Sequence, residues 1–238
     1  MNETPKIYPH LLPNIEDWPI YKLSEDRRRF VRELEAHTLA HFMRKPLTAQ
    51  RDILAKTIYM ERIRVKEEPW KVDPPKERPF WKKMQQKLVI IENDPAAATQ
   101  NHAEIFQQIL HRYAEEIVGT FNIRTFRFAR RFLTMFFTRL LNTAAGRSIL
   151  GSRHRLYDRM MVKGQADTVR SLFSKGTVVV VPTHFSNLDS ILIGYAMDTF
   201  AGLPSFSYGA GLNLYNAGFA AYFMNRLGAY RGDRRKKN

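Results

Sequence analysis

The fold class depends most on one stretch of the chain, Gly176-Thr-Val-Val-Val-Val-Pro-Thr-His184-Phe-Ser-Asn-Leu-Asp189. Its four consecutive valines, Val178 to Val181, are β-branched, and the run 177–181 is bounded by Gly176 and Pro182. A short apolar run without alternating polar residues is typical of a strand that is covered on both faces, as in a parallel sheet. We therefore predict a buried strand over 177–181.

The segments around this strand alternate between strand and helix patterns. Further strands are predicted at 156–162, 205–208 and 228–231, and helices at 165–174, 188–200 and 212–226. This alternation favours an α/β fold, in which ligands bind beyond the carboxyl ends of parallel strands. Functional side chains are therefore expected just after Val181, Tyr208 and Tyr230.

The first part of the chain has the pattern of helices. Apolar residues recur at helical spacing in 24–43 and 47–65, after the helix start Asp94-Pro95, and in 117–142. The last of these segments is rich in Arg and Phe and contains no acidic residue. We expect two domains, a helical N-terminal region over 1–145 and an incomplete, mostly parallel α/β domain over 146–238.

The composition limits the chemistry of the chain. It contains no cysteine, which excludes disulfides, thiolate metal sites and a cysteine nucleophile. The 38 Lys and Arg residues against 23 Asp and Glu residues give a net charge of +15. The expected partners are therefore anionic: nucleic acid, an acidic lipid surface or a phosphorylated small molecule. Residues 1–18 lack the apolar core of a signal peptide, so export is not expected.

His184 and Asp189 are the candidate catalytic pair. Ser186 is a good helix N-cap, which would place Asp189 in the first turn of the next helix and His184 in the loop before it. A histidine can accept a proton from a hydroxyl near neutral pH, and a carboxylate can fix its tautomer. The alternative is that Asp189 only caps the helix and that His184 has no chemical role.

The motifs on which this pair lies resemble those of a known family. The stretch from Val178 to Leu192 resembles the first motif, His followed by four residues and Asp, of the glycerol-3-phosphate and lysophosphatidic acid acyltransferase superfamily. The stretch Leu227-Gly-Ala-Tyr-Arg231-Gly-Asp-Arg234-Arg235 resembles the second motif, which supplies arginine to the phosphate of the acceptor. The likeness covers about 156–237. Members of the family carry a third motif, with Glu and Gly, further along than the second, and the printed sequence stops at Asn238 before that position, so the resemblance is to an incomplete acyltransferase domain.

The resemblance implies transfer of a fatty acyl group from a thioester of CoA or acyl carrier protein to glycerol 3-phosphate or its monoacyl form. It implies that His184 deprotonates the acceptor hydroxyl, that Asp189 orients His184, and that no acyl-enzyme forms. It implies no metal and no cofactor, since the acyl thioester is a co-substrate. The expected substrate-binding residues are Arg231, Arg234, Ser186, Asn187 and Gly228. Arginine also suits phosphate on physical grounds, because its guanidinium matches phosphate oxygens in a bidentate manner.

The basic segment 117–142 has two interpretations. Its phenylalanines and arginines could lie on an anionic membrane surface, or the rings could pack on the α/β layer with the arginines in water. The uncharged stretch 199–225 is interrupted by glycines and a proline, so a membrane span is not expected there. We expect peripheral or monotopic association with the cytoplasmic face of a membrane. The alternative function is that of a non-catalytic basic protein that binds nucleic acid or anionic membranes, although no nucleic-acid-binding motif is present.

Overall fold

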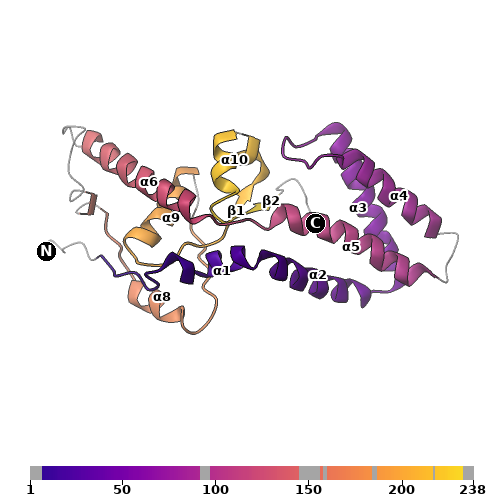
Figure 1. Cartoon of the computed structure of the whole chain (residues 1–238), viewed down its shortest axis with the longest axis horizontal. Coiled ribbons are helices and arrows are strands. Elements are labelled where there is room, and N and C mark those ends of the chain that lie inside the picture. The colour runs from indigo at the N-terminus through magenta and orange to yellow at the C-terminus, as the bar shows by residue number, and fades with distance from the viewer. Residues whose placement is uncertain are drawn as a thin grey trace. The chain divides into compact units, whose positions relative to one another are not determined.

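The computed structural model describes residues 7–91, 97–144, 156–157, 160–183, 187–216 and 218–232. The chain divides into two compact units, Met1–Glu25 with Phe121–Ser207, and Asp26–Thr120 with Tyr208–Asn238. We call them the first and the second unit, and Figure 1 labels helices and strands of both. The domain boundary expected between residues 145 and 146 lies outside the described residues.

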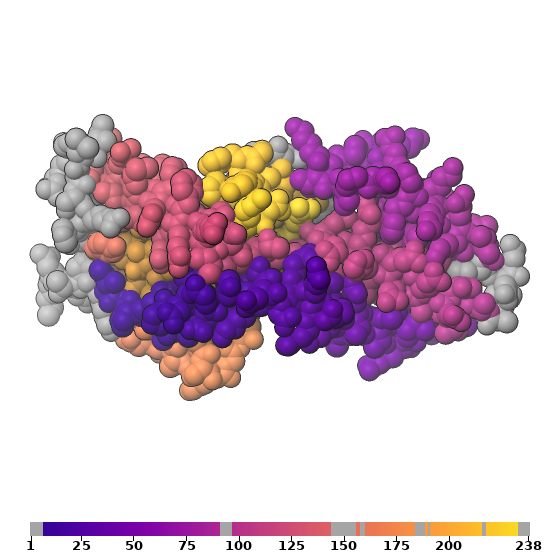
Figure 2. Space-filling view, viewed as in Figure 1, coloured from indigo at the N-terminus to yellow at the C-terminus, as the bar shows by residue number. Residues whose placement is uncertain are grey.

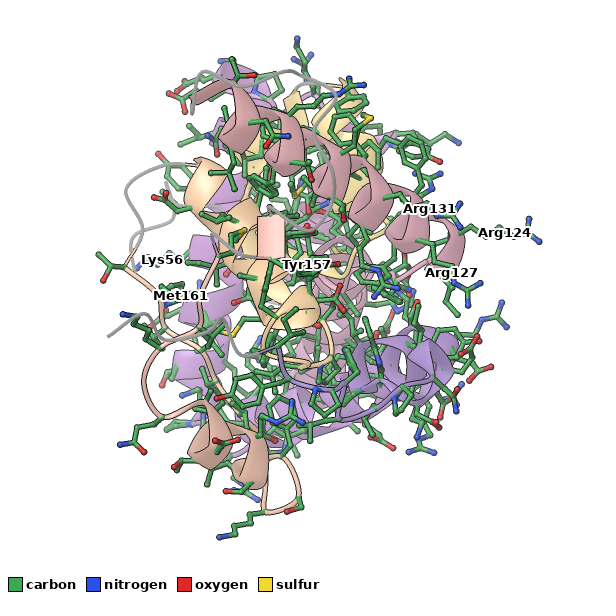
Figure 3. All side chains as sticks on the ribbon, turned by 90° about the vertical axis from the view of Figure 1, so that its left-hand side faces the viewer. Lys56, Arg124, Arg127, Arg131, Tyr157 and Met161 are labelled. Carbon is green, nitrogen blue, oxygen red and sulfur yellow. The ribbon has the colours of Figure 1, made fainter. Side chains whose placement is uncertain are left out.

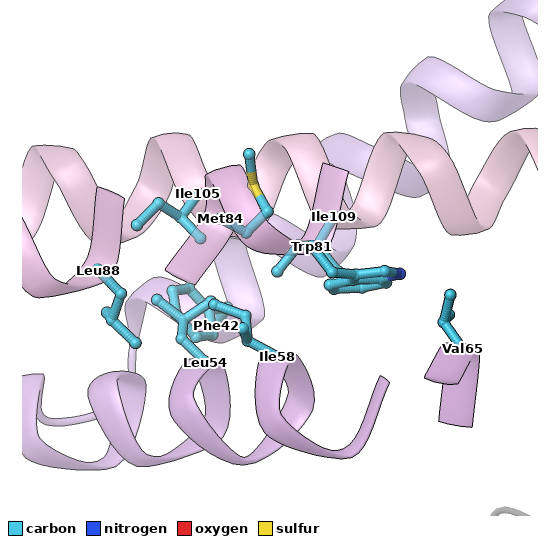
Figure 4. Packing of buried hydrophobic residues seen from close by; sticks show 9 residues of the cluster. All are labelled: Phe42, Leu54, Ile58, Val65, Trp81, Met84, Leu88, Ile105 and Ile109. Carbon is cyan, nitrogen blue, oxygen red and sulfur yellow. The ribbon is translucent and has the colours of Figure 1, made fainter. Parts of the chain in front are cut away.

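Four helices build most of the second unit: α2 (Arg27–Met43), α3 (Leu47–Glu67), α4 (Glu77–Ile91) and α5 (Ala98–Ile117). Helix α5 packs against the other three. Their apolar sides enclose one core, in which Trp81 and Met84 are completely buried. Figure 4 shows nine residues of this core: Phe42, Leu54, Ile58, Val65, Trp81, Met84, Leu88, Ile105 and Ile109. The helical periodicity of 24–43 and 47–65 is confirmed by α2 and α3.

The same unit contains a small parallel sheet. Strand β1 (Tyr208–Gly211) pairs with β2 (Ala229–Gly232) in parallel, with Tyr208 opposite Ala229 and Ala210 opposite Arg231. The 3₁₀ helix η3 (Leu212–Asn216) and helix α10 (Gly218–Met224) connect the two strands. This strand–helix–strand unit is what the pattern of the sequence predicted for 205–231, with the first strand three residues later than expected and the helix shorter.

The first unit consists of η1 (Ile15–Asp17), α1 (Pro19–Glu25), α6 (Ile123–Ala144), α8 (Ala166–Leu172) and α9 (Asn187–Thr199) among its described residues. Helix α6 starts where the Asn122 side chain accepts a hydrogen bond from the amide of Thr125 at 2.9 Å. Its inner side contacts α9, where the rings of Phe137 and Tyr195 lie 5.2 Å apart. The helices predicted at 165–174 and 188–200 are confirmed by α8 and α9.

The buried strand predicted at 177–181 is wrong. These residues belong to no helix or strand, and Val179 and Val181 are 77% and 88% exposed. A valine run becomes an inner strand only where neighbouring strands pair with it and other elements cover it. The sheet in the described part of the chain consists of β1 and β2, and neither pairs with this run. The valines favour an extended backbone, but no strand in the described part of the chain pairs with them.

The strand predicted at 156–162 is also wrong, because residues 156–157 are helical and 160–162 form no strand. Leu156 is nevertheless buried in the core of the first unit with Phe137, Tyr195 and Phe200. The apolar residues of this segment therefore serve a helical contact instead of a sheet. The described chain is mostly helical with one two-stranded parallel sheet, so the predicted α/β class holds only in this broad sense.

Candidate functional site

Asp189 lies in the first turn of α9, as predicted. The helix begins at Asn187, which makes Asp189 its third residue, and this carboxylate is partly buried. A negative charge in the first turn is stabilised by the unpaired backbone N–H groups and by the helix dipole. His184 and Ser186 lie outside the described residues, as does the side chain of Asn187. The contact between His184 and Asp189 therefore stays a prediction.

Arg231 lies on β2, where two contacts hold its guanidinium. The Nη2 atom donates a hydrogen bond to Oδ1 of Asn225 at 3.0 Å, and the guanidinium carbon lies 5.0 Å from the centre of the Tyr215 ring. A guanidinium carries five N–H donors in a fixed plane, so a group held in this way can present its other edge to an anion. Arg234, the second predicted phosphate ligand, lies outside the described residues.

Gly228 forms the bend that leads into β2. Its φ of 79° is in the left-handed region, which favours glycine, and its amide donates to the carbonyl oxygen of Thr120 at 2.8 Å. The hydroxyl of Thr120 donates in turn to the carbonyl oxygen of Asn225 at 2.5 Å. The segment after α5 is thus fastened to the turn that carries Asn225 and Gly228. The substrate-binding role expected for Gly228 stays a prediction.

A cavity of about 230 Å³ lies beside Arg231 in the second unit. Its polar lining includes Arg27, Glu115, Glu116, Thr120, Asn225 and Arg231. Arg27 is anchored by its hydrogen bonds to Oε2 of Glu115 at 2.7 Å and to the carbonyl oxygen of Val118 at 3.2 Å. Of this lining, only Arg231 was predicted from the sequence. Arg27 and Glu116 could not be found in that way, because no local pattern links α2 and α5 to a strand near the end of the printed sequence.

Glu116 gives the cavity a group that titrates near neutral pH. Burial raises the pKa of Glu116 to about 7, and repulsion from Glu77 adds to this effect. The charges of Arg112 and Arg231 oppose the shift without cancelling it. When Glu116 is protonated, the charged side chains of the cavity are Arg27, Arg231 and Glu115, an arrangement with excess positive charge that favours an anion.

A buried ionic network stands behind Glu116. Arg64 of α3 donates to Oε2 of Glu61 at 2.7 Å and to the carboxylate of Asp73 at 2.9 Å. Glu77 of α4 accepts hydrogen bonds from the indole of Trp81 and from Arg112 of α5. Nε of Arg112 also lies 3.4 Å from Glu116. Arg64 also lies 3.7 Å from Glu77, so the network joins three helices and fixes the position of the α5 turn that lines the cavity.

We expect Glu116→Gln to change how stability depends on pH. The folded pKa of about 7 lies above the ordinary value of 4.5, so the folded chain binds more protons than the unfolded chain between these two pH values. The contribution of Glu116 to stability is therefore present below about pH 4.5 and is lost as the pH rises through 7. Above pH 7, the unfolding free energy of the variant should therefore exceed that of the wild type by at most about 3 kcal/mol. The variant should also melt at a higher temperature there.

Thermal unfolding followed by circular dichroism at pH 5 and pH 8 measures this effect. The matched control is Glu33→Gln on α2, whose side chain is 66% exposed and pairs with Arg29 at the surface. In this control, the difference between the melting temperatures at pH 5 and pH 8 should be the same as in the wild type. A Glu116→Gln variant that is less stable than the wild type at pH 8 would show that the charged form is favoured.

A second His–Asp pair occurs in the first unit and was not predicted. Nε2 of His10 lies 3.4 Å from Oδ1 of the buried Asp198, which also faces Arg130 at 3.3 Å. Nδ1 of His10 accepts a hydrogen bond from the amide of Leu12 at 3.2 Å. Both ring nitrogens thus face protein groups, so this pair is suited to structure and not to proton transfer with a substrate.

Asp189 belongs to the first unit, and Arg231 and Gly228 belong to the second. Comparison of the chain with protein-family models, with curated proteins and with solved structures gives no match. No helix in the described ranges combines the length and the apolar character needed to cross a membrane.

Proposed function

We propose that the chain is an O-acyltransferase of glycerolipid synthesis. It transfers a fatty acyl group from a thioester of CoA or acyl carrier protein to a hydroxyl of glycerol 3-phosphate or its monoacyl form, at the cytoplasmic face of a membrane. The observation that carries the proposal is the position of Asp189, in the first turn of a helix that begins three residues after His184. The order of the two motifs in the sequence supports the same activity.

In the proposed reaction, His184 removes the proton of the acceptor hydroxyl, and Asp189 stabilises the imidazolium that forms. The hydroxyl oxygen attacks the thioester carbonyl carbon, a C–O bond forms, and the C–S bond breaks. The imidazolium then returns the proton to the leaving thiolate. Backbone N–H groups at the start of α9 are suited to stabilise the oxyanion of the intermediate, because the helix N-terminus attracts negative charge.

The phosphate of the acceptor is assigned to Arg231, with Arg234 as its partner. Support comes from the way in which Asn225 and Tyr215 hold the Arg231 guanidinium beside a cavity. Because the phosphate does not react, its contacts are the same in the ground state and in the transition state. They should therefore affect the Michaelis constant of the acceptor more than the turnover number.

Acyl transfer to three acceptors tests the proposal: glycerol 3-phosphate, its monoacyl form, and glycerol, which lacks the phosphate. We expect Arg231→Ala to raise KM for the phosphorylated acceptors by about 10- to 100-fold, the size of one lost charge-assisted contact. The matched control is Arg226→Ala, because Arg226 stacks on Tyr222 of α10 and is assigned no role. An equal KM in the wild type and in Arg231→Ala would reject the phosphate assignment.

A further inference from the structure

Helix α6 carries an exposed face that its packing leaves uncovered. Exposed residues recur every three or four positions along the helix, from Arg124 to Leu140. We call this the α6 face. Its large apolar members are Phe128, Phe132, Met135, Phe136 and Leu140, and Phe128 is 60% exposed. In the space-filling view, side chains of α6 form part of the surface of the first unit (Figure 2).

The opposite side of α6 packs into the core of the first unit. Phe126 and Phe137 are buried there, and Phe137 belongs to the core formed with Leu156, Tyr195 and Phe200. Arg130 lies toward this side and faces the buried Asp198. The interpretation in which rings of the basic segment pack inside the protein thus holds for this side of the helix. Core packing explains the inner rings, but it does not explain the exposed ones.

The charge of the α6 face has one sign. Helix α6 contains no Asp or Glu, and the α6 face includes Arg124, Arg127, Arg131 and Arg139. Figure 3 shows Arg124, Arg127 and Arg131 projecting away from the helix. Within the described ranges, Arg127 meets the carboxylate of Glu16 at 3.9 Å, and the other three arginines form no ion pair.

We propose that the α6 face is a docking surface for an anionic lipid bilayer. Arginines that flank a ridge of phenylalanine, methionine and leucine match the charged headgroups and the acyl layer below them. A nucleic acid would use the positive charge, but it offers no apolar layer to five large apolar side chains. This inference rests on exposure and charge, and it is independent of the acyl-transfer chemistry.

Vesicle co-sedimentation of the whole chain tests the proposal. The probes are vesicles of phosphatidylcholine alone, vesicles of phosphatidylcholine with phosphatidylserine, and duplex and single-stranded DNA at the same ionic strength. We expect binding to the anionic vesicles that weakens with salt. The triple variant Arg124→Gln, Arg131→Gln, Arg139→Gln should bind them about 100-fold more weakly, since each arginine near the surface contributes about a factor of five.

Matched control variants remove the same number of positive charges or aromatic rings from helices other than α6. Arg28→Gln with Arg32→Gln and Lys56→Gln removes three exposed positive charges from α2 and α3. Phe128→Ser with Phe132→Ser is compared with Tyr59→Ser and Phe219→Ser, since Tyr59 and Phe219 are exposed rings outside α6. We expect both α6 variants to lose vesicle binding while both controls keep most of it. Equal losses in the variants and the controls would overturn the assignment to α6.

A labelled side chain gives a second readout that does not depend on removing the rings. The chain has no cysteine, so Met135→Cys can carry a single fluorophore that responds to its environment. Its emission should shift to the blue on anionic vesicles, and a quencher in the acyl layer should reduce it. The same label at Tyr59→Cys should not respond. An unresponsive label at position 135, or DNA binding with no preference for anionic vesicles, would overturn the proposal.

Discussion

His184→Ala is expected to abolish most of the acyl transfer while the fold stays intact. If His184 is the general base, its removal should lower kcat by about 10²- to 10⁴-fold. In the sequence, His184 precedes Asn187, the first residue of α9, so the substitution changes no residue of that helix. The transfer rate, measured with labelled acyl thioester at saturating acceptor, checks the effect, and circular dichroism checks the fold.

Two further variants make this result specific. His37→Ala removes an exposed histidine of α2 and should leave the transfer rate unchanged. Asp189→Asn keeps the hydrogen-bonding shape at the start of α9, but it removes the charge that stabilises the imidazolium. It should therefore be slow and should melt close to the wild type. If Asp189→Asn only lowers the melting temperature, Asp189 is a helix cap and the catalytic pair is wrong.

Gly119→Ala is expected to destabilise the second unit strongly. A Cβ atom at position 119 would lie 2.1 Å from the carbonyl oxygen of Ala229, at the start of β2. The carbonyl oxygen is a backbone atom and the Cβ is bonded directly to the backbone, so neither can move away without shifting the strand or the segment after α5. We expect the free energy of unfolding to fall by about 3 kcal/mol, which is the upper end of the usual cost of adding a methyl group to a packed site. This corresponds to a fall of roughly 10 °C in the thermal midpoint.

The matched control is Gly176→Ala. A Cβ atom there meets nothing within 4 Å, and the φ of Gly176 is outside the left-handed region, so the thermal midpoint should be unchanged or slightly higher. Differential scanning calorimetry compares the two variants. Equal midpoints would mean that the segment after α5 does not approach β2 as described. Because Ala229 lies two residues before Arg231, the result also tests the geometry of the cavity.

The helices could be predicted from the sequence because their signals are local. The apolar spacing in 47–65 is a property of the segment itself, and α3 covers it with two further residues at its end. Asp189 in the first turn of α9 is local in the same sense, since a helix start depends on its nearest residues. Strand β2 was found at 229–232, one residue from the predicted position, where a glycine marks its start.

The predictions that were wrong needed information from elsewhere in the chain. The run 177–181 has the composition of a buried strand, but burial depends on neighbours that the run cannot specify. The same limit applies to the site. Glu116 acquires its raised pKa from burial beside Glu77 on another helix, and Arg27 reaches the cavity from α2. These contacts join segments that are distant in the sequence, so they leave no local pattern in it.

Mass spectrometry of a single reaction mixture tests the central claim most directly. The chain is incubated with an acyl thioester and isotope-labelled glycerol 3-phosphate. The masses of the small molecules and of the intact chain are then measured. Direct attack by the acceptor predicts a labelled ester, one free thiol for each ester formed, and a chain of unchanged mass. The absence of the ester, or a chain whose mass has increased by one acyl group during turnover, would contradict the account.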